Sequence, residues 1–141
     1  MNDVSKNIRA YVFTQVDGNI TFNAANVPLY TKAPPNATYP YVIVKSTGLA
    51  DEPTKDKFGG IYEIQLEIIT RFNINLGGQD DADDISNSIL NLLRLRTQSS
   101  DFGSDTMYIL KQTNQRYIED DDQEFHYYTK ILTFEAYVSE N

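Results

Sequence analysis

A strict alternation of side-chain character over residues 61–72 constrains the fold of this chain more than any other feature. In IYEIQLEIITRF, the even positions from Tyr62 to Phe72 carry apolar side chains or threonine, whereas the odd positions include two glutamates, a glutamine and an arginine. Because successive side chains of a strand point to opposite faces, this pattern predicts a strand with one buried face and one mostly solvated face. Burial on one side favours an antiparallel sheet over a parallel sheet covered on both faces.

Two more strand patterns near the C-terminus predict a long β-hairpin. Residues 106–118 (TMYILKQTNQRYI) form its first arm and residues 124–138 (EFHYYTKILTFEAYV) form its second. On the second arm, one face suits the core, with Tyr128, Leu132, Phe134, Ala136 and Val138. The opposite face carries Phe125, Tyr127, Thr129, Ile131, Thr133 and Tyr137, and is more apolar than a solvated face should be. Such a face indicates either an interface with another molecule or cover from residues 19–40.

Apolar residues at helical spacing predict two helices. In residues 3–17, one stripe contains Val4, Ile8, Tyr11 and Val12, Asp3 can serve as the N-cap, and Asp17-Gly18 ends the helix. Phe13 projects from the opposite side, where it either lies over a loop or meets another molecule. The second helix covers residues 80–96 (DDADDISNSILNLLRLR), with a stripe of Ala82, Ile85, Ile89, Leu92 and Leu93.

Aspartates crowd the start of the second helix, and arginines lie near its end. Asp80, Asp81, Asp83 and Asp84 complement the positive end of the helix dipole, and Arg94 and Arg96 complement the negative end. A calcium-binding EF-hand would need a glycine at its sixth position, where Ile85 stands. The aspartates are therefore interpreted as helix-terminal charges rather than as metal ligands.

The remaining segments give weaker signals. Residues 19–40 have no clear pattern, although 27–31 (VPLYT) could form a short edge strand, and the adjacent Pro34 and Pro35 make 32–40 a loop. Residues 41–45 (YVIVK) predict a buried strand. Residues 47–60 read as a long polar connection with glycine at both ends, and a connection of that length is often functional.

Composition limits the function classes that remain open. A length of 141 residues predicts one domain over 1–141, with an N-terminal helix (1–18), an irregular arm (19–40) and a core of sheet and helix (41–138). The chain contains no cysteine, which excludes disulfides and thiolate chemistry, and its net charge of −8 argues against general nucleic-acid binding. No segment resembles a signal peptide or a membrane span, which predicts a soluble protein made in a cytoplasm.

The stretch 117–128 (YIEDDDQEFHYY) forms the tip of the predicted hairpin and carries the one histidine of the chain. Aspartate suits a turn, but a turn does not explain five carboxylates in six positions. A calcium site is possible there, although the spacing matches no EF-hand. A Ser-His-Asp arrangement would have to use His126, which is interpreted as a surface or packing residue. We expect no enzymatic activity, no metal and no cofactor.

Residues 39–138 resemble the tail terminator (tail-completion) proteins of long-tailed bacteriophages. The resemblance rests on YPYVIV (39–44), GGIYEIQLEIITRF (59–72), DDADDISNSILNLL (80–93) and YYTKILTFEAYV (127–138). It implies an α+β subunit in which two helices pack on one face of an antiparallel sheet that ends in the long C-terminal β-hairpin. The family offers no catalytic residues to transfer.

The resemblance also implies a role in the virion. Such proteins form a ring, typically of six copies, that caps the tail tube, ends its polymerisation and meets the head–neck connector proteins. Genomic DNA passes through the ring without specific binding, and the ring lies at the tail–neck junction after assembly in the host bacterial cytoplasm. The alternatives are another neck or head-completion protein, or a small ligand-binding domain or enzyme.

Three groups of residues are candidates for contacts in such an assembly. Candidates for the lumen or a partner ring are Glu119, Asp120, Asp121, Asp122 and Glu124. Candidates for a loop that touches tube or neck are Asp51, Glu52, Lys55, Asp56 and Lys57. Candidates for the face between subunits are Phe13, Phe125, Tyr127, Ile131 and Tyr137.

Overall fold

The computed structural model describes residues 3–51, 59–74, 76–93 and 100–141. Two helices and eight strands follow one another along these residues, and four of the strands are only two residues long. The elements are α1 (Ser5–Val16), β1 (Thr21–Phe22), β2 (Ala25–Asn26), β3 (Leu29–Tyr30), β4 (Tyr41–Asp51), β5 (Gly59–Asn73), α2 (Asp80–Leu92), β6 (Ser100–Asp101), β7 (Asp105–Asp121) and β8 (Phe125–Glu140).

One six-stranded sheet, in the order β3-β4-β5-β8-β7-β6, organises the molecule. Its centre is the antiparallel pair of β5 and β8, whose register runs from Gly59 opposite Ser139 to Asn73 opposite Phe125. The pairing is antiparallel throughout except between β3 and β4. The antiparallel sheet and the long C-terminal hairpin of β7 and β8 confirm the predicted α+β fold class.

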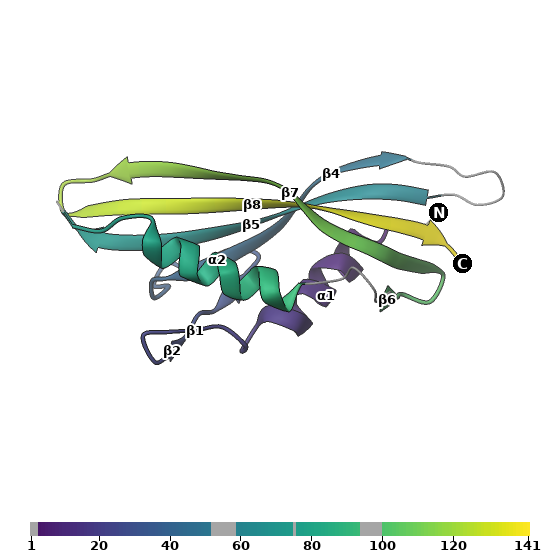
Figure 1. Cartoon of the computed structure of the whole chain (residues 1–141), viewed down its shortest axis with the longest axis horizontal. Coiled ribbons are helices and arrows are strands. Elements are labelled where there is room, and N and C mark those ends of the chain that lie inside the picture. Colours follow the sequence, from purple (N-terminus) through teal and green to yellow (C-terminus); the bar gives the residue numbers. More distant parts are fainter. Residues whose placement is uncertain (1–2, 52–58, 75, 94–99) are drawn as a thin grey trace.

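Both helices lie on the same side of the sheet, as predicted (Figure 1). The alternation in β5 buries Tyr62, Ile64, Leu66, Ile68 and Thr70 against them. From α1 the core receives Ile8, Val12 and Val16, and from α2 it receives Ala82, Ile85 and Ile89. No helix of the described residues lies on the other side of the sheet, which forms the upper surface in Figure 1. The predicted helical stripes are therefore the faces that cover the sheet.

Three predicted boundaries differ from the structure. The first helix begins at Ser5 with Val4 at its N-cap, and the Asp3 carboxylate instead accepts hydrogen bonds from the Ser5 N–H and hydroxyl. The second helix ends at Leu92, and the two arginines assigned to its last turn lie outside the described residues. The strand predicted at 41–45 continues to Asp51, so residues 47–51 of the predicted polar connection are strand.

A bulge explains why β4 is longer than its sequence suggests. The register against β5 shifts between Ser46 and Gly48, and from there to Asp51 the strand pairs with residues 60–63. A bulge interrupts the alternation of faces, so polar residues and glycine can continue a strand without the expected pattern. The connection between β4 and β5 is thus confined to residues 52–58, which lie outside the described residues.

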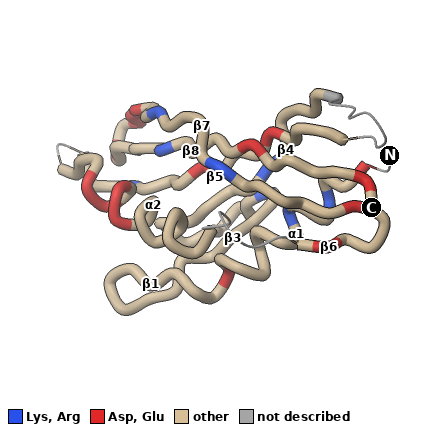
Figure 2. Tube along the Cα trace, turned by 45° about the vertical axis from the view of Figure 1, so that its right-hand side comes forward, with Lys and Arg blue, Asp and Glu red and all other residues tan. Residues whose placement is uncertain are grey.

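Part of the segment 19–40 is regular. Residues 21–26 form a small antiparallel pair, β1–β2, that lies on the side of the helices (Figures 1 and 2). The tentative edge strand at 27–31 is confirmed, because β3 pairs with Val42 and Ile43 at the edge of the sheet. Among the described residues, no helix is both long enough and apolar enough to cross a membrane.

Candidate functional site

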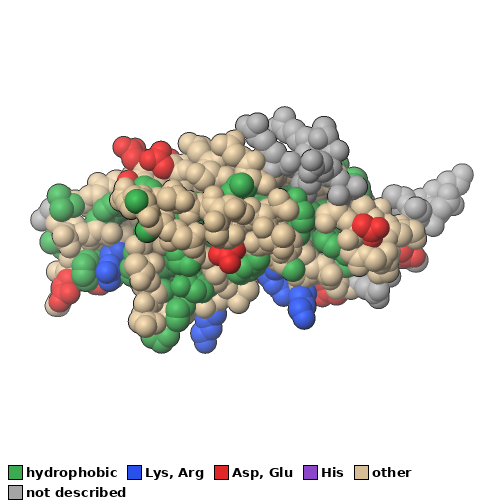
Figure 3. Space-filling view, turned by 90° about the horizontal axis from the view of Figure 1, so that it is seen from below, with side chains coloured by type: hydrophobic (Ala, Val, Ile, Leu, Met, Phe, Trp, Pro, Cys, Tyr) green, Lys and Arg blue, Asp and Glu red, His purple; other side chains and the backbone are tan. Residues whose placement is uncertain are grey.

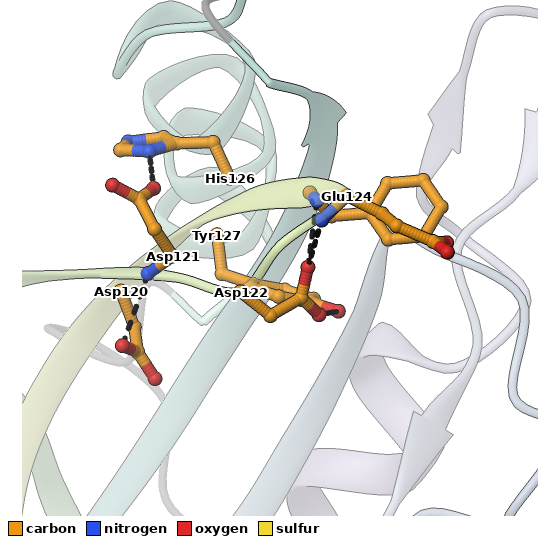
Figure 4. Close-up of polar contacts among 7 residues, drawn as sticks. Asp120, Asp121, Asp122, Glu124, His126 and Tyr127 are labelled. Atoms are coloured by element: carbon orange, nitrogen blue, oxygen red, sulfur yellow. Dashed lines mark hydrogen bonds and ion pairs between the residues drawn. The ribbon is translucent and has the colours of Figure 1, made fainter.

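The tip of the β7–β8 hairpin is built around Asp122. Its Oδ1 accepts the N–H groups of Glu124 at 2.8 Å and Phe125 at 2.7 Å, and its Oδ2 accepts the Tyr127 hydroxyl at 2.9 Å (Figure 4). These hydrogen bonds, led by the two backbone N–H groups, hold the pKa of Asp122 below its usual range. The turn prediction for this stretch is confirmed, and Asp122 serves the turn itself rather than a free acidic surface.

Two more of the five tip carboxylates have partners nearby. The Asp121 carboxylate contacts Nδ1 of His126, whose ring lies 4.4 Å from that of Tyr128. Asp120 accepts the N–H of Asp121 at 3.0 Å. His126 and Tyr127 extend to opposite sides of β8 (Figure 4). Within the described part of the chain, the side chains of Glu119 and Glu124 accept no hydrogen bond, and all five tip acids are exposed.

His126 lies over a small cavity on the side of the helices. The cavity has a volume of about 320 Å³, opens to solvent, and is lined by Ile74, Leu76, Gly77, Asp121, His126 and Tyr128. Two of these side chains, Ile74 and Leu76, are 46% and 63% exposed. A single carboxylate beside one imidazole does not form a serine triad. His126 lies between Asp121 and Tyr128, which agrees with its interpretation as a packing residue.

On the opposite face of the hairpin, Arg71 stacks between two aromatic rings. Its guanidinium carbon lies 4.4 Å from the centre of the Tyr39 ring and 4.2 Å from that of Phe125. Tyr39 also contacts Tyr127, with ring centres 6.0 Å apart, and Tyr41 at 5.1 Å. Tyr39 therefore packs the end of the 19–40 segment against the open face of the sheet, which is the face that carries Phe125 and Tyr127 and bears no helix among the described residues. Cover from residues 19–40 is thus partial, because residue 39 lies over one end of this face while β1 and β2 lie on the other side of the sheet (Figure 1), and an interface with another molecule stays a prediction.

The first turn of α2 joins the hairpin tip to form one acidic end of the molecule (Figure 2). Asp83 connects the two elements: its Oδ1 lies 2.7 Å from the Lys130 ammonium and accepts the Tyr117 hydroxyl at 2.5 Å. These contacts, with that of Lys130 the largest, lower the pKa of Asp83. Burial alone would lower the pKa of Lys130, but hydrogen bonds to Asp83 and Tyr117 outweigh it and raise that pKa.

The sequence pattern does not predict this connection. The α2 aspartates were assigned to the helix dipole, and nothing marked Lys130 as their partner, although its place on a core-facing position of a strand was a usable signal. Burial raises the pKa of Asp81, and the charges of Asp84 and Asp80 raise it further. The carboxylates in the first turn of α2 therefore repel one another, and among them it is Asp83 that pairs with Lys130.

The five residues assigned to a face between subunits are not equally accessible. Phe125, Tyr127 and Tyr137 lie half-buried on the open face, and the Tyr137 ring contacts Tyr108 at 6.3 Å between centres. Ile131 lies on the same face but is only 3% exposed. Its register partners are Glu67 on β5 and Arg116 on β7. Phe13 is half-buried and packs against the core on the other side of the sheet.

The candidate contact loop falls largely outside the described residues. Glu52, Lys55, Asp56 and Lys57 all lie in the segment 52–58, and Asp51 is the last residue of β4. Within the described ranges, no group of three or more histidine and acidic side chains has the geometry to hold a metal ion. Viewed from the side of the helices, hydrophobic side chains are visible in separate patches, and basic groups lie along one long rim (Figure 3).

Comparison with known proteins gives a match at the level of fold. No family model matches the chain, and no curated protein does. Among solved structures, the chain is similar to one described as "Virion of native gene transfer agent (GTA) particle", with a TM-score of 0.63 and 17% sequence identity. The similarity covers 98% of this chain and 92% of that chain, so the two share their fold from end to end.

Proposed function

We propose that this chain is a structural protein of a tailed virus-like particle, and that it forms a ring that caps the tail tube and joins it to the neck. The observation that carries the proposal is the end-to-end likeness of fold to a chain of a gene transfer agent virion, at a TM-score of 0.63. The resemblance of residues 39–138 to tail terminators supports the finer role. In this proposal the chain acts as an assembly protein and catalyses no reaction.

A ring of identical subunits needs a heterologous contact, in which one surface of a subunit meets a different surface of the next. The two edges of the sheet, along β4 and along β7, offer two unlike surfaces on one subunit (Figure 1). The acidic end supplies a third surface, suited to the opening of a channel through which DNA passes without sticking, because carboxylates repel phosphates at short range.

Particles made without this chain test the role. We expect headless tails whose tubes exceed the normal length, and we expect normal attached tails once the chain is supplied again; electron microscopy of negatively stained particles measures both. Headless tails of normal length would instead assign the chain to head completion. Tails of normal length attached to filled heads would contradict both roles.

The acidic tip has its own prediction. The triple variant Glu119→Gln, Asp120→Asn, Glu124→Gln removes three charges and leaves Asp121 and Asp122 in place for His126 and the turn. We expect the variant subunit to fold with an unchanged circular dichroism spectrum, and we expect particles that carry it to release DNA more slowly, most of all at low salt, where charge effects are least screened. DNA release from purified particles, followed by dye fluorescence, measures the rate.

A matched control is Asp17→Asn, which removes one exposed charge at the end of α1 and should leave release unchanged. If the triple variant assembles in normal yield and releases DNA at the rate of the unaltered particle at every salt concentration, the tip does not face the DNA path.

A further inference from the structure

Both edges of the six-stranded sheet are largely unpaired. On β7, the short strand β6 pairs only with Thr106 and Met107, and from Tyr108 to Asp121 no described residue pairs with the outer side of the strand. On β4, β3 pairs only with Val42 and Ile43, and from Val44 onward no described strand lies beside it. Unpaired edges present rows of free N–H and C=O groups that can bind another strand.

Apolar side chains accompany these free backbone groups. On β7, Tyr108 and Ile109 are 43% and 38% exposed, and on β4 Leu49 is 50% exposed. Residues 45–50 of β4 are exposed throughout. Addition of a strand at such an edge gains backbone hydrogen bonds and removes apolar surface from water together.

The open parts of the two edges lie at the same level of the sheet. Through the registers, Val44 aligns with Leu66, then with Leu132, then with Gln115. In the same way, Ala50 aligns with Ile61, Tyr137 and Ile109. The open stretch 44–50 of β4 therefore faces outward at the height where 109–115 of β7 faces outward on the other edge. β3 closes one edge beyond one end of this window, and β6 closes the other edge beyond the opposite end.

The strand directions also suit a joint between copies. Three successive antiparallel pairings separate β4 from β7, so the two edge strands run in opposite directions. A rotation about an axis along the strands preserves those directions, and it would bring β7 of one copy antiparallel to β4 of the next. Antiparallel pairing is the slightly more stable arrangement.

Bulges on both edges favour a second copy of this chain over an arbitrary strand. The register of β4 shifts between Ser46 and Gly48, and that of β7 shifts between Met107 and Ile109 and again between Gln112 and Asn114. The β4 shift and the second β7 shift lie at adjacent levels of the sheet. A bulge bends and twists its strand, so a flat foreign strand fits poorly beside it. Two edges that bend at the same height can follow one another.

We propose that copies of this chain join edge to edge, with residues 44–50 of β4 pairing antiparallel with residues 109–115 of β7 in the neighbouring copy, so that one sheet continues around the ring. This joint rests on the proposed ring function and specifies its interface. The open sheet face then becomes one continuous wall of the ring, and the helices lie on the other wall.

Engineered cysteines test the joint cleanly, because the chain has none of its own. Ala50→Cys on β4 is combined with Ile109→Cys, Lys111→Cys or Asn114→Cys on β7, positions that are all exposed and paired with the open-face positions of the adjacent strand. The three choices on β7 allow for stagger between copies. After mild oxidation of assembled rings, non-reducing electrophoresis should show a ladder of linked chains for at least one double variant.

Mixtures of single variants determine which edges meet. A mixture of Ala50→Cys chains with the matching β7 variant should give a linked dimer, and each single variant alone should give none. Dimers from a β7 variant alone would overturn the proposal in favour of a two-fold contact. Rings that are visible by electron microscopy but unlinked across the panel would overturn the joint and leave the ring function standing. If no rings form and tails made without the chain are normal, the ring function fails.

Discussion

Replacing Gly77 with alanine should lower the free energy of unfolding by about 3 kcal/mol, from left-handed backbone strain and overpacking together. Gly77 has φ +98° in the loop that leads from β5 to α2, a conformation that residues with a Cβ rarely adopt. An added Cβ would also lie 2.3 Å from Cγ of Phe72. Urea denaturation followed by circular dichroism measures the loss as a lower midpoint with an unchanged slope.

The neighbouring glycine is a matched control. A Cβ on Gly78 would meet no atom within 4 Å, and its φ is not positive. Gly78→Ala should therefore change the stability by no more than about 0.5 kcal/mol. Equal losses at the two positions would mean that the contact with Phe72 does not restrict residue 77.

Asp83→Ala should destabilise the protein by about 2 kcal/mol, because it leaves the Lys130 ammonium buried without its carboxylate. Breaking a fully buried pair costs more, but the Asp83 side chain is 39% exposed, and solvent screens its half of the pair. The lysine, at 6% side-chain exposure, has little access to water. Thermal and urea denaturation at neutral pH measure the loss.

The pH dependence of this loss has a definite sign. The folded-state pKa of Asp83 is lowered, so its contribution is complete above the ordinary pKa of a carboxyl group and is lost as the pH falls through the lowered folded value. The difference between the unaltered chain and Asp83→Ala should thus be constant near neutrality and shrink in strong acid. A difference that grows as the pH falls would contradict the assignment.

Two further variants isolate the pair. Asp84→Ala removes an adjacent exposed acid that does not reach Lys130, and it should leave the stability nearly unchanged. Adding Lys130→Met to Asp83→Ala removes the unpaired ammonium and should recover part of the loss. If the double variant is less stable than Asp83→Ala alone, Lys130 contributes through packing of its chain rather than through its charge.

The sequence predicts the fold best where the spacing of apolar residues within one element is enough to identify its buried face. The alternation of β5 and the helical stripe of α2 are periodic signals, and both match the buried faces. The extension of β4 to Asp51 was missed, because a bulge at Ser46/Gly48 breaks the alternation that marks a strand. The position of such a bulge depends on the pairing of β4 with β5, and the pattern of apolar residues within β4 does not determine that pairing.

The candidate site was predicted less completely, because its contacts join residues far apart in the chain. The turn role of aspartate at the tip follows from its own chemistry, and Asp122 has that role. The stacking of Arg71 between Tyr39 and Phe125 brings together three separate elements, and no spacing rule connects them. The run of aspartates at the start of α2 likewise indicates a solvated helix end, and nothing in that run predicts that Asp83 pairs with Lys130.

The central position of β8 has a consequence for how the chain reaches its native state. β5 and β7 each pair along their length with β8, which follows both of them in the sequence. A nascent chain on the ribosome therefore holds both strands without their principal neighbour until residues 125–140 have emerged. We expect the sheet to form only after that point, so that premature termination before residue 125 yields aggregation-prone fragments rather than a smaller stable unit.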